Sequence, residues 1–380
     1  MKRFLAEQGR YLRRLGGTTL STVTAFLFLA SPVSSAIEPY RGIAYDERVD
    51  PSLHKRKSTG VSTQAIAEAT THLLDGLSAT QRQQASFAVD SEQWRVWSNF
   101  HRSNERLGLR LGDLSATSRA NVFELLRQSL SAKGLKLSED IIKLNHVLGV
   151  ITGDTHSFNE DEYYLALFGR PSDNEPWGFQ FEGHHLVINY FILGDQVVMS
   201  PTFWGSEPMY SPPDAALPPR YQGLSVLQVE RSGAKDFLAS LNPEQAKKAR
   251  LRGWQSFISG AGNDNAKVPQ EGIRGNELQG SQRQALAVLI ENFVGNLREG
   301  HADIAMDEVR AHLDDTWFVA RERDDGRIYY RIFSPVILIE FDEIHGTFTD
   351  HQHVHAVVRT PNGNDYGQSL LRQHLEQHPH

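Results

Sequence analysis

Apolar residues recur at helical spacing in two long blocks of the chain and again at its C-terminal end. The first helix is predicted over residues 63–77, and a Ser78–Gln81 capping box opens the next one. Ser115 begins another helix that Gly134 would end, and Ser138 begins the helix after it. The later helices are predicted from Asn242-Pro243, over 281–298, over about 301–314 and over 369–377.

Alternation of apolar and polar residues replaces helical spacing in the middle and near the end of the chain. The pattern predicts two antiparallel strands, over residues 178–193 and 196–202, joined by a turn at Gly194-Asp195. The first of these strands is long enough to be interrupted along its length. Residues 204–220 hold five prolines and predict a loop long enough to be a lid. Four more strands are predicted over 316–321, 328–334, 336–342 and 353–359, with a hairpin turn at Asp324-Asp325-Gly326.

Strands and helices occur in blocks rather than in regular β-α-β alternation. The predicted class is therefore α+β, with an antiparallel sheet from the middle and C-terminal strands packed against helical N-terminal and central blocks. With 39% hydrophobic and 22% charged residues, the 380-residue chain has an ordinary globular composition. We expect residues 37–62 to form an extended arm and residues 63–380 a single α+β domain.

The first 36 residues have the pattern of an export signal. Basic residues precede a short apolar stretch over 18–30, and Pro32-Val-Ser-Ser-Ala36 offers small residues at a cleavage site. Arg13-Arg14 suggests the twin-arginine route, although no Phe-Leu-Lys follows the pair. An ordinary secretory signal or an uncleaved anchor is the alternative. The predicted location is periplasmic or secreted.

Charge and hydropathy narrow the range of partners. Removing the signal would take away five of the 39 basic residues and one of the 46 acidic residues, which moves the formal charge from −7 to −11. An acidic surface without a basic stripe argues against nucleic acid. No apolar run reaches the roughly 20 residues of a membrane-spanning helix. We expect a small-molecule substrate or ligand and no stable membrane span after signal cleavage, while the oligomeric state is not indicated.

Two groups of histidines carry the chemistry expected of this chain. His184 and His185 follow Glu182 in the first group, and His353 and His355 form the second, where strand alternation puts both imidazoles on one face. Adjacent histidines on a strand would point to opposite faces, so one ion would take either His184 or His185 more easily than both. Because the chain has no cysteine, any metal must be held by His, Asn, Tyr or carboxylate side chains. The alternative is that these histidines are hydrogen-bonded core residues.

Carboxylates and an arginine accompany the second histidine group. Glu340 and Asp342 lie on the preceding predicted strand, where either could complete a metal site or orient an imidazole. Arg359 could hold a substrate carboxylate, and the alternative is an ion pair with Asp365. The predicted catalytic residues are therefore Glu182, Arg359 and Asp365. The predicted metal ligands are His184, His185, His353, His355, Glu340 and Asp342.

Several sequence blocks resemble one known family. They are Tyr164–Pro171, Pro176–His185, Pro201–Gly205 with Glu207-Pro208, Tyr330–Pro335, Ile339–Asp342, His353–His355, Arg359–Pro361 and Asp365–Gly367. Together they are similar to the bacterial and fungal family called domain of unknown function 3500, over about residues 60–378. The resemblance implies one continuous domain, and it brings neither an activity nor a cofactor with it.

The residues favour an exported metal-dependent enzyme that acts on a small organic substrate. His184, His353 and His355 would bind the ion, with Glu340 or Asp342 as a further ligand or base. Zinc would support hydrolysis, the preferred reaction, whereas copper or iron would support oxygen chemistry, and this ligand set does not separate the three metals. The alternative is a non-catalytic periplasmic protein that binds a small molecule or the metal itself.

Overall fold

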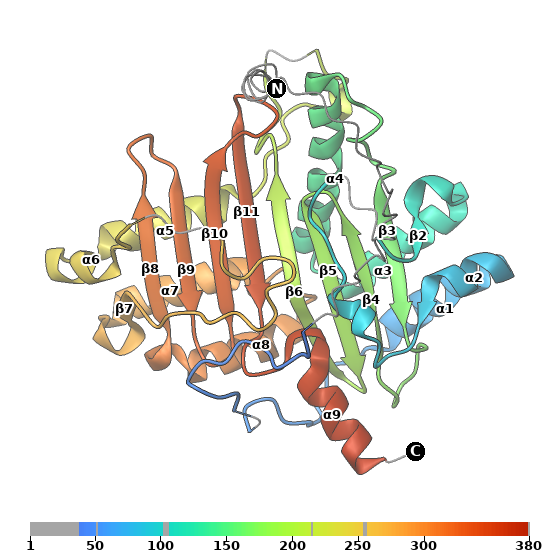
Figure 1. The fold of residues 1–380 in the computed structure, drawn as a ribbon, viewed down its shortest axis with the longest axis horizontal. Coiled ribbons are helices and arrows are strands. Elements are labelled where there is room, and N and C mark those ends of the chain that lie inside the picture. Colours follow the sequence, from blue (N-terminus) through green and yellow to red (C-terminus); the bar gives the residue numbers. More distant parts are fainter. Residues whose placement is uncertain (1–37, 51, 102–105, 214–215, 254–256, 379–380) are drawn as a thin grey trace, which may run out of the picture. The chain divides into compact units, whose positions relative to one another are not determined.

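A largely antiparallel sheet of eleven strands organises the part of the chain that the structure describes (Figure 1). The computed structural model describes residues 38–50, 52–101, 106–213, 216–253 and 257–378. The strands are β1 (Ser86–Phe87), β2 (Leu109–Arg110), β3 (Tyr163–Phe168), β4 (Trp177–Gly183), β5 (Leu186–Leu193), β6 (Gln196–Ser206), β7 (Ile273–Arg274), β8 (Trp317–Glu322), β9 (Ile328–Phe333), β10 (Leu338–His345) and β11 (Gln352–Arg359).

The order of the strands joins two halves of the chain. Across the sheet it reads β1-β3-β4-β5-β6-β11-β10-β9-β8-β7, with β2 paired to β3 and β1 running parallel to β3. The middle strands β3–β6 and the C-terminal strands β8–β11 are therefore neighbours through one antiparallel pairing, that of β6 with β11. This confirms the predicted α+β class and the origin of its sheet.

The helices fall in the two predicted blocks and at the C-terminal end. The α-helices are α1 (Gln64–Asp75), α2 (Ala79–Ala85), α3 (Ala116–Ser129), α4 (Ala132–Thr152), α5 (Gln228–Ser240), α6 (Pro243–Ala249), α7 (Gly280–Val294), α8 (His301–Ala311) and α9 (Gln368–Gln377). Short 3-10 helices cover Glu92–Arg95, Leu111–Asp113, Pro219–Tyr221, Gly275–Glu277, Leu313–Asp315 and Asp365–Gly367. The capping box predicted at Ser78 is formed, and Asn242 is the predicted N-cap, where Gln245 completes a capping box as well.

The two faces of the sheet are covered differently, because consecutive strand residues point to opposite sides. On β11, Ala356 packs in the large core that contains the apolar faces of α1, α3, α4, α5, α7 and α8. Its neighbour Val357 packs in a second core with Trp94, Trp97 and Tyr366, which belong to short segments and 3-10 helices. In Figure 1 the long helices lie behind the sheet, whereas α9 and the irregular segments lie in front of it.

Several elements differ from the prediction: β3 was not predicted, β10 is shifted to Leu338–His345, and one helix boundary and one loop boundary have clear physical reasons. α4 begins at Ala132 with Ser131 as its N-cap, so Gly134 lies inside this helix and Ser138 does not start it. A Cβ on Gly134 would lie 2.3 Å from the backbone oxygen of Asn296, so this glycine serves close packing rather than helix termination. β6 continues to Ser206 because it pairs with β11, which places Trp204 in the sheet and starts the loop at Glu207.

The N-terminal part of the chain is only partly described. The described residues from Tyr40 onwards form one compact unit by their contacts. The predicted signal over residues 1–36 lies outside the described residues, so export stays a prediction. Among the described residues, no helix combines the length and the apolar character needed to cross a membrane.

We predict that Gly134→Ala destabilises the protein although alanine is the better helix former. The new methyl group would overlap the Asn296 carbonyl, and relieving that overlap should cost about 1–3 kcal/mol of unfolding free energy. Gly233→Ala on α5 is the matched control, because its Cβ would meet its nearest neighbour at an ordinary 3.4 Å. Urea denaturation of both variants checks the prediction, and equal stabilities would contradict it.

Candidate metal centre

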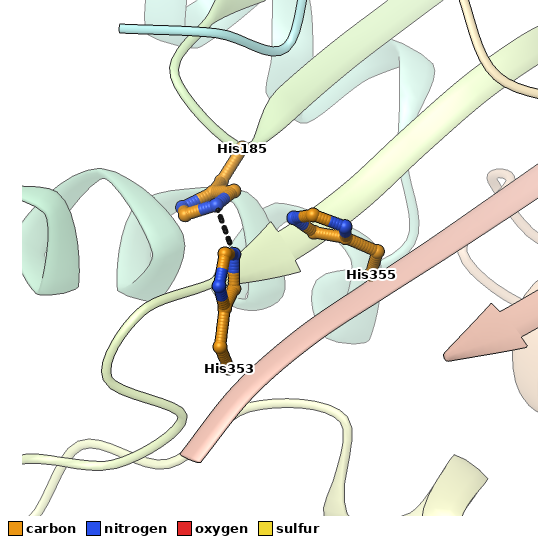
Figure 2. Close-up of side chains that lie close together, drawn as sticks. All are labelled: His185, His353 and His355. Carbon is orange, nitrogen blue, oxygen red and sulfur yellow. Dashed lines mark hydrogen bonds between the residues drawn. The ribbon is translucent and has the colours of Figure 1, made fainter. Parts of the chain in front are cut away.

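Three imidazoles from two separate parts of the chain meet at one end of β6 and β11. One ring nitrogen from each of His185, His353 and His355 lies within 4.8 Å of the other two (Figure 2). Nε2 of His185 is 2.9 Å from Nε2 of His353. Among the described residues, this histidine triad is the one group of three or more potential ligands that meets such a spacing.

His185 reaches the triad because it occupies a tight turn rather than a strand. β4 and β5 pair up to Gly183 and Leu186, so His184 and His185 are the two turn residues. His185 has φ of 65°, a left-handed conformation in which histidine is enriched among non-glycine residues. Its amide N–H donates to the Asn99 carbonyl at 3.1 Å, and its own carbonyl accepts from the Gly205 amide at 2.8 Å. These two bonds hold the turn against neighbouring segments.

His353 and His355 alternate on β11, as predicted, and their rings lie on the same face with centroids 4.4 Å apart. His353 is buried and His355 is half-buried, but Nε2 of His355 is shielded from solvent and has no hydrogen-bond partner among the described residues. His355 pairs with Gly205 of β6, where a Cβ would lie 2.7 Å from the backbone oxygen of Val354 and 3.1 Å from the imidazole Cδ2 of His355. Glycine at 205 therefore leaves room for the neighbouring strand and for the ring.

Glu207 lies in the loop that follows β6, next to His353 of the triad. Its side chain is fully buried, and Oε2 lies 3.2 Å from Nδ1 of His353, on the ring edge opposite the triad. Oε1 accepts from the backbone amides of Phe348 and Thr349 at 2.7 and 2.8 Å. Oε2 has no aligned hydrogen-bond partner among the described residues, so the contact with His353 is close without being linear. The hydroxyl of Thr347 also lies 3.3 Å from Nδ1 of His353. A nearby carboxylate favours the tautomer with the proton on Nδ1, which leaves Nε2 free to bind a metal.

The protonation states of the triad suit a metal ion. Burial, followed by the neighbouring histidines, lowers the pKa of His185 and of His355 well below the ordinary value. Burial also lowers the pKa of His353, and Glu207 opposes this shift. Metals bind neutral imidazole, so the fold holds these three ligands in the form that a metal requires.

The family of the chain is shown by a match over most of its length. A sequence model described as "Protein of unknown function (DUF3500)" matches residues 59–368. The chain belongs to the DUF3500 family. No curated protein and no solved structure matches the chain significantly. The resemblance found in the sequence is thereby confirmed, and the function must be argued from the site.

His184 lies beside the triad of this DUF3500 member and not in it. Its Nδ1 is 2.7 Å from Oδ1 of Asn145 on α4, and its ring stacks on His185 at 3.8 Å. The predicted grouping of His184 with His353 and His355 depended on a regular strand. In the two-residue turn strand alternation does not apply, and the ring of His185 faces the second pair instead.

Glu182 is a buried carboxyl group on β4. Its Oε2 accepts from the Ser98 amide at 2.9 Å and lies 3.7 Å from Nη1 of Arg106. Its Oε1 has no hydrogen-bond partner among the described residues. Burial raises the pKa of Glu182 to about 7, and Arg106 offsets only part of this shift. The group can therefore exchange a proton near neutral pH, as a general acid or base must.

Glu340 and Asp342 lie on β10, beside the histidine strand, but bind other partners. Glu340 accepts from the amides of Ile258 and Ser259 and from the hydroxyl of Tyr329, so its carboxylate anchors a neighbouring segment. Asp342 pairs directly with His355 across the sheet, and its Oδ1 accepts from Arg323 at 2.7 Å. Neither carboxylate is within the ligand spacing of the triad.

Arg359 and Asp365 form the ion pair that was the alternative to a substrate-binding role. Nη1 of Arg359 lies 2.8 Å from Asp365 and 3.0 Å from Asp264. Its Nε and Nη2 donate to the carbonyls of Ser259 and Gly260. All three guanidinium nitrogens are thus occupied inside a fully buried network, an arrangement that favours a structural role.

Two residues of the centre do not stand out as site residues in the sequence. Glu207 appears there only within a family-like block, and Asn145 lies in a helix with no distinguishing pattern. The position of Glu207 just beyond a strand is a usable signal, but only the β6–β11 register places it against His353. That pairing joins residues about 150 positions apart and has no local signature.

We predict that Glu182→Gln removes a pH-dependent loss of stability. The pKa of Glu182 is about 7 in the folded chain, above its ordinary value, so the unfolded chain loses this proton first as the pH rises. From about pH 4.5 to 7 this group should lower the unfolding free energy by roughly 3 kcal/mol in total. Urea denaturation at pH 5 and pH 8 should show a smaller difference between the two pH values for the variant.

The control is Glu376→Gln, which removes a carboxylate whose side chain is 69% exposed. It should leave the pH dependence as it is in the unmodified chain. An equal pH dependence in Glu182→Gln and the unmodified chain would contradict the prediction.

Proposed function

We propose that this chain is a metal-dependent hydrolase in which His185, His353 and His355 hold one zinc ion. The observation that carries the proposal is the convergence of three neutral imidazoles with their nitrogens within 4.8 Å of one another. Three histidines without a fourth protein ligand are typical of catalytic zinc sites, whereas structural zinc sites have four. Zinc held in this way lowers the pKa of a water molecule in the open position to about 7.

The spacing of the triad is close to what zinc needs. Tetrahedral zinc with bonds of about 2.0–2.1 Å places neighbouring ligand nitrogens roughly 3.3 Å apart. The 2.9 Å pair of His185 and His353 would open slightly, and His355 would close in by a small rotation. The proton between the first two rings, on Nε2 of His185 when His353 is protonated on Nδ1, would move to Nδ1 of His185, so that Nε2 of both neutral rings could bind the ion.

The surrounding residues position the ligands and limit water. Phe203 and Phe257 lie beside the ring of His355, with centroids 5.1 and 6.2 Å away. Glu207 orients His353, and the stacked His184 limits rotation of His185. Glu182 lies on β4, three residues before His185, and burial raises its pKa to about 7.

For the metal site itself, we predict that the purified full chain binds one equivalent of zinc and that His353→Ala binds none at the same free zinc concentration. Loss of one of three ligands leaves only His185 and His355, which should bind zinc too weakly to retain it, whereas the fold of β11 should tolerate alanine on a paired strand. Elemental analysis after dialysis against zinc measures the stoichiometry. His345→Ala is the matched control, because that side chain is 84% exposed and lies outside the triad.

The same samples test the reaction. Zinc-loaded chain is assayed with small carboxylic esters, amides and phosphate esters. Turnover that needs zinc and disappears in His353→Ala supports a hydrolase. Stoichiometric zinc without turnover in any of these classes would contradict hydrolysis and favour the alternative, a non-catalytic metal-binding protein. No bound zinc would contradict the proposed site itself.

A second prediction concerns Glu207. Glu207→Gln keeps an oxygen for the amides of Phe348 and Thr349 but removes the negative charge facing Nδ1 of His353. Zinc affinity should fall roughly 10- to 100-fold, as it does when partners behind metal-bound histidines are changed. Competition titration with a chelator measures the affinity. Unchanged affinity in a folded variant would show that Glu207 only anchors the loop.

A further inference from the structure

Two adjoining cavities lie at the ends of β6 and β11 that are remote from the triad. The inner cavity, of about 120 Å³, lies between the sheet and helices α7 and α8. The outer cavity, of about 80 Å³, lies between α8, the start of β6 and the arm residues 54–59. They share several lining residues, among them Val198, Ala305 and Asn364, so they adjoin.

The inner cavity is on the opposite face of the sheet from the triad. Thr202 lines it and pairs with Val358, whose side chain points to the helical core. His353 and His355 alternate with Val358 and so face the other side. This cavity cannot belong to the metal centre.

Three buried polar atoms in the cavity walls have no hydrogen-bond partner among the described residues. They are Oγ1 of Thr202 and Oδ1 of Asn364 in the inner cavity and Nε2 of His301 in the outer one. Each residue is at most 4% exposed. A buried polar atom left unpaired costs about 1–3 kcal/mol, so three around one space mark a place where a ligand or water supplies the bonds.

Two of the three unpaired atoms are hydrogen-bond acceptors, so the ligand must supply a donor. Oδ1 of Asn364 can only accept. The pKa of His301 is lowered to about 4, first by burial and then by Arg298, so its ring is neutral at pH 7. Its other nitrogen bonds the backbone of Ser62, which leaves Nε2 as an acceptor. Thr202 can donate or accept, so a ligand hydroxyl group can donate to Asn364 and accept from Thr202, while a water molecule can donate to His301 in the outer cavity.

The other lining residues favour a ligand that is mostly apolar and carries no charge. Phe293, Val309 and Val358 are among the mostly apolar side chains of the inner cavity. At the outer cavity, Lys57 and Glu308 form an ion pair with Nζ and Oε1 3.2 Å apart, so each neutralises the other. Lys55 also lines the outer cavity, but it is exposed and water screens its charge, so the described lining offers a carboxylate or an ammonium group no buried unpaired opposite charge.

We propose that the joined cavities bind a small uncharged alcohol or phenol. Its apolar body fills the inner cavity and its hydroxyl group lies near Asn364, towards the outer cavity. The volume is suited to one aromatic ring, since an apolar cavity of about 150 Å³ binds benzene. This site is independent of the proposed zinc chemistry.

The test is calorimetric titration of the full chain with benzyl alcohol as the probe. Toluene, benzoate and benzylamine, which have a similar ring, are titrated alongside it. Benzyl alcohol should bind with one-to-one stoichiometry and at least about tenfold more tightly than each of the other three. Thr202→Val, which keeps the shape of the side chain, should weaken benzyl alcohol about three- to tenfold.

Two further measurements distinguish binding in these cavities from binding elsewhere on the chain. Ala305→Phe fills the shared wall and should abolish binding, with circular dichroism and urea denaturation checking that the variant folds. Removing metal with a chelator should leave benzyl alcohol binding unchanged. No saturable binding, equal affinity for any of the other three probes, an unaffected Thr202→Val variant, or loss of binding on chelation would each overturn the proposal.

Discussion

The antiparallel pairing of β6 with β11 is the constraint on which the sheet and its candidate centre depend. It joins strands from the middle of the chain to strands from its end, and it aligns His355 with Gly205 and Val354 with Ser206. The same register carries Glu207 to the back of His353 and holds the His185 turn through the Gly205 amide. A shift of one residue would turn the His353 and His355 rings to the helical face.

The sheet also separates two chemical environments. Behind it, long amphipathic helices bury an apolar core that contains the inner cavity. In front of it, short segments are fixed by buried charges, above all by Arg359 between Asp264 and Asp365. Such a network is costly to bury and gives directional bonds in return, which suits irregular backbone that no ladder holds in place. Trp97 contributes to it, since its indole N–H donates to the Tyr366 hydroxyl at 2.8 Å.

Much of this arrangement could be predicted from local patterns. Apolar spacing and caps located most helices, and alternation located the C-terminal strands and the shared face of His353 and His355. The turn at His184-His185 was not predicted, because two histidines in a polar–apolar strand pattern have no turn signature such as Asn-Gly. The prediction of a helix end at Gly134 was wrong because the sequence does not show the Asn296 carbonyl that excludes a side chain there.

The candidate centre could be predicted only in part, because it too depends on contacts between residues that are distant in sequence. Residue type and spacing pointed to the histidines, whereas the choice between His184 and His185 and the part played by Glu207 depend on long-range register. Glu340, Asp342 and Arg359 were plausible by proximity in sequence, yet each has buried partners of its own. Proximity along a strand identifies neighbours and does not show which of them already bind elsewhere.

The most direct test of the account is the position of the metal itself. Crystals of the full chain grown with zinc, measured at the zinc absorption edge, would show an anomalous peak where the ion binds. The account predicts one strong peak about 2.0–2.1 Å from a ring nitrogen of each of His185, His353 and His355. A strong peak at other residues, or none among these three rings at full zinc loading, would contradict it.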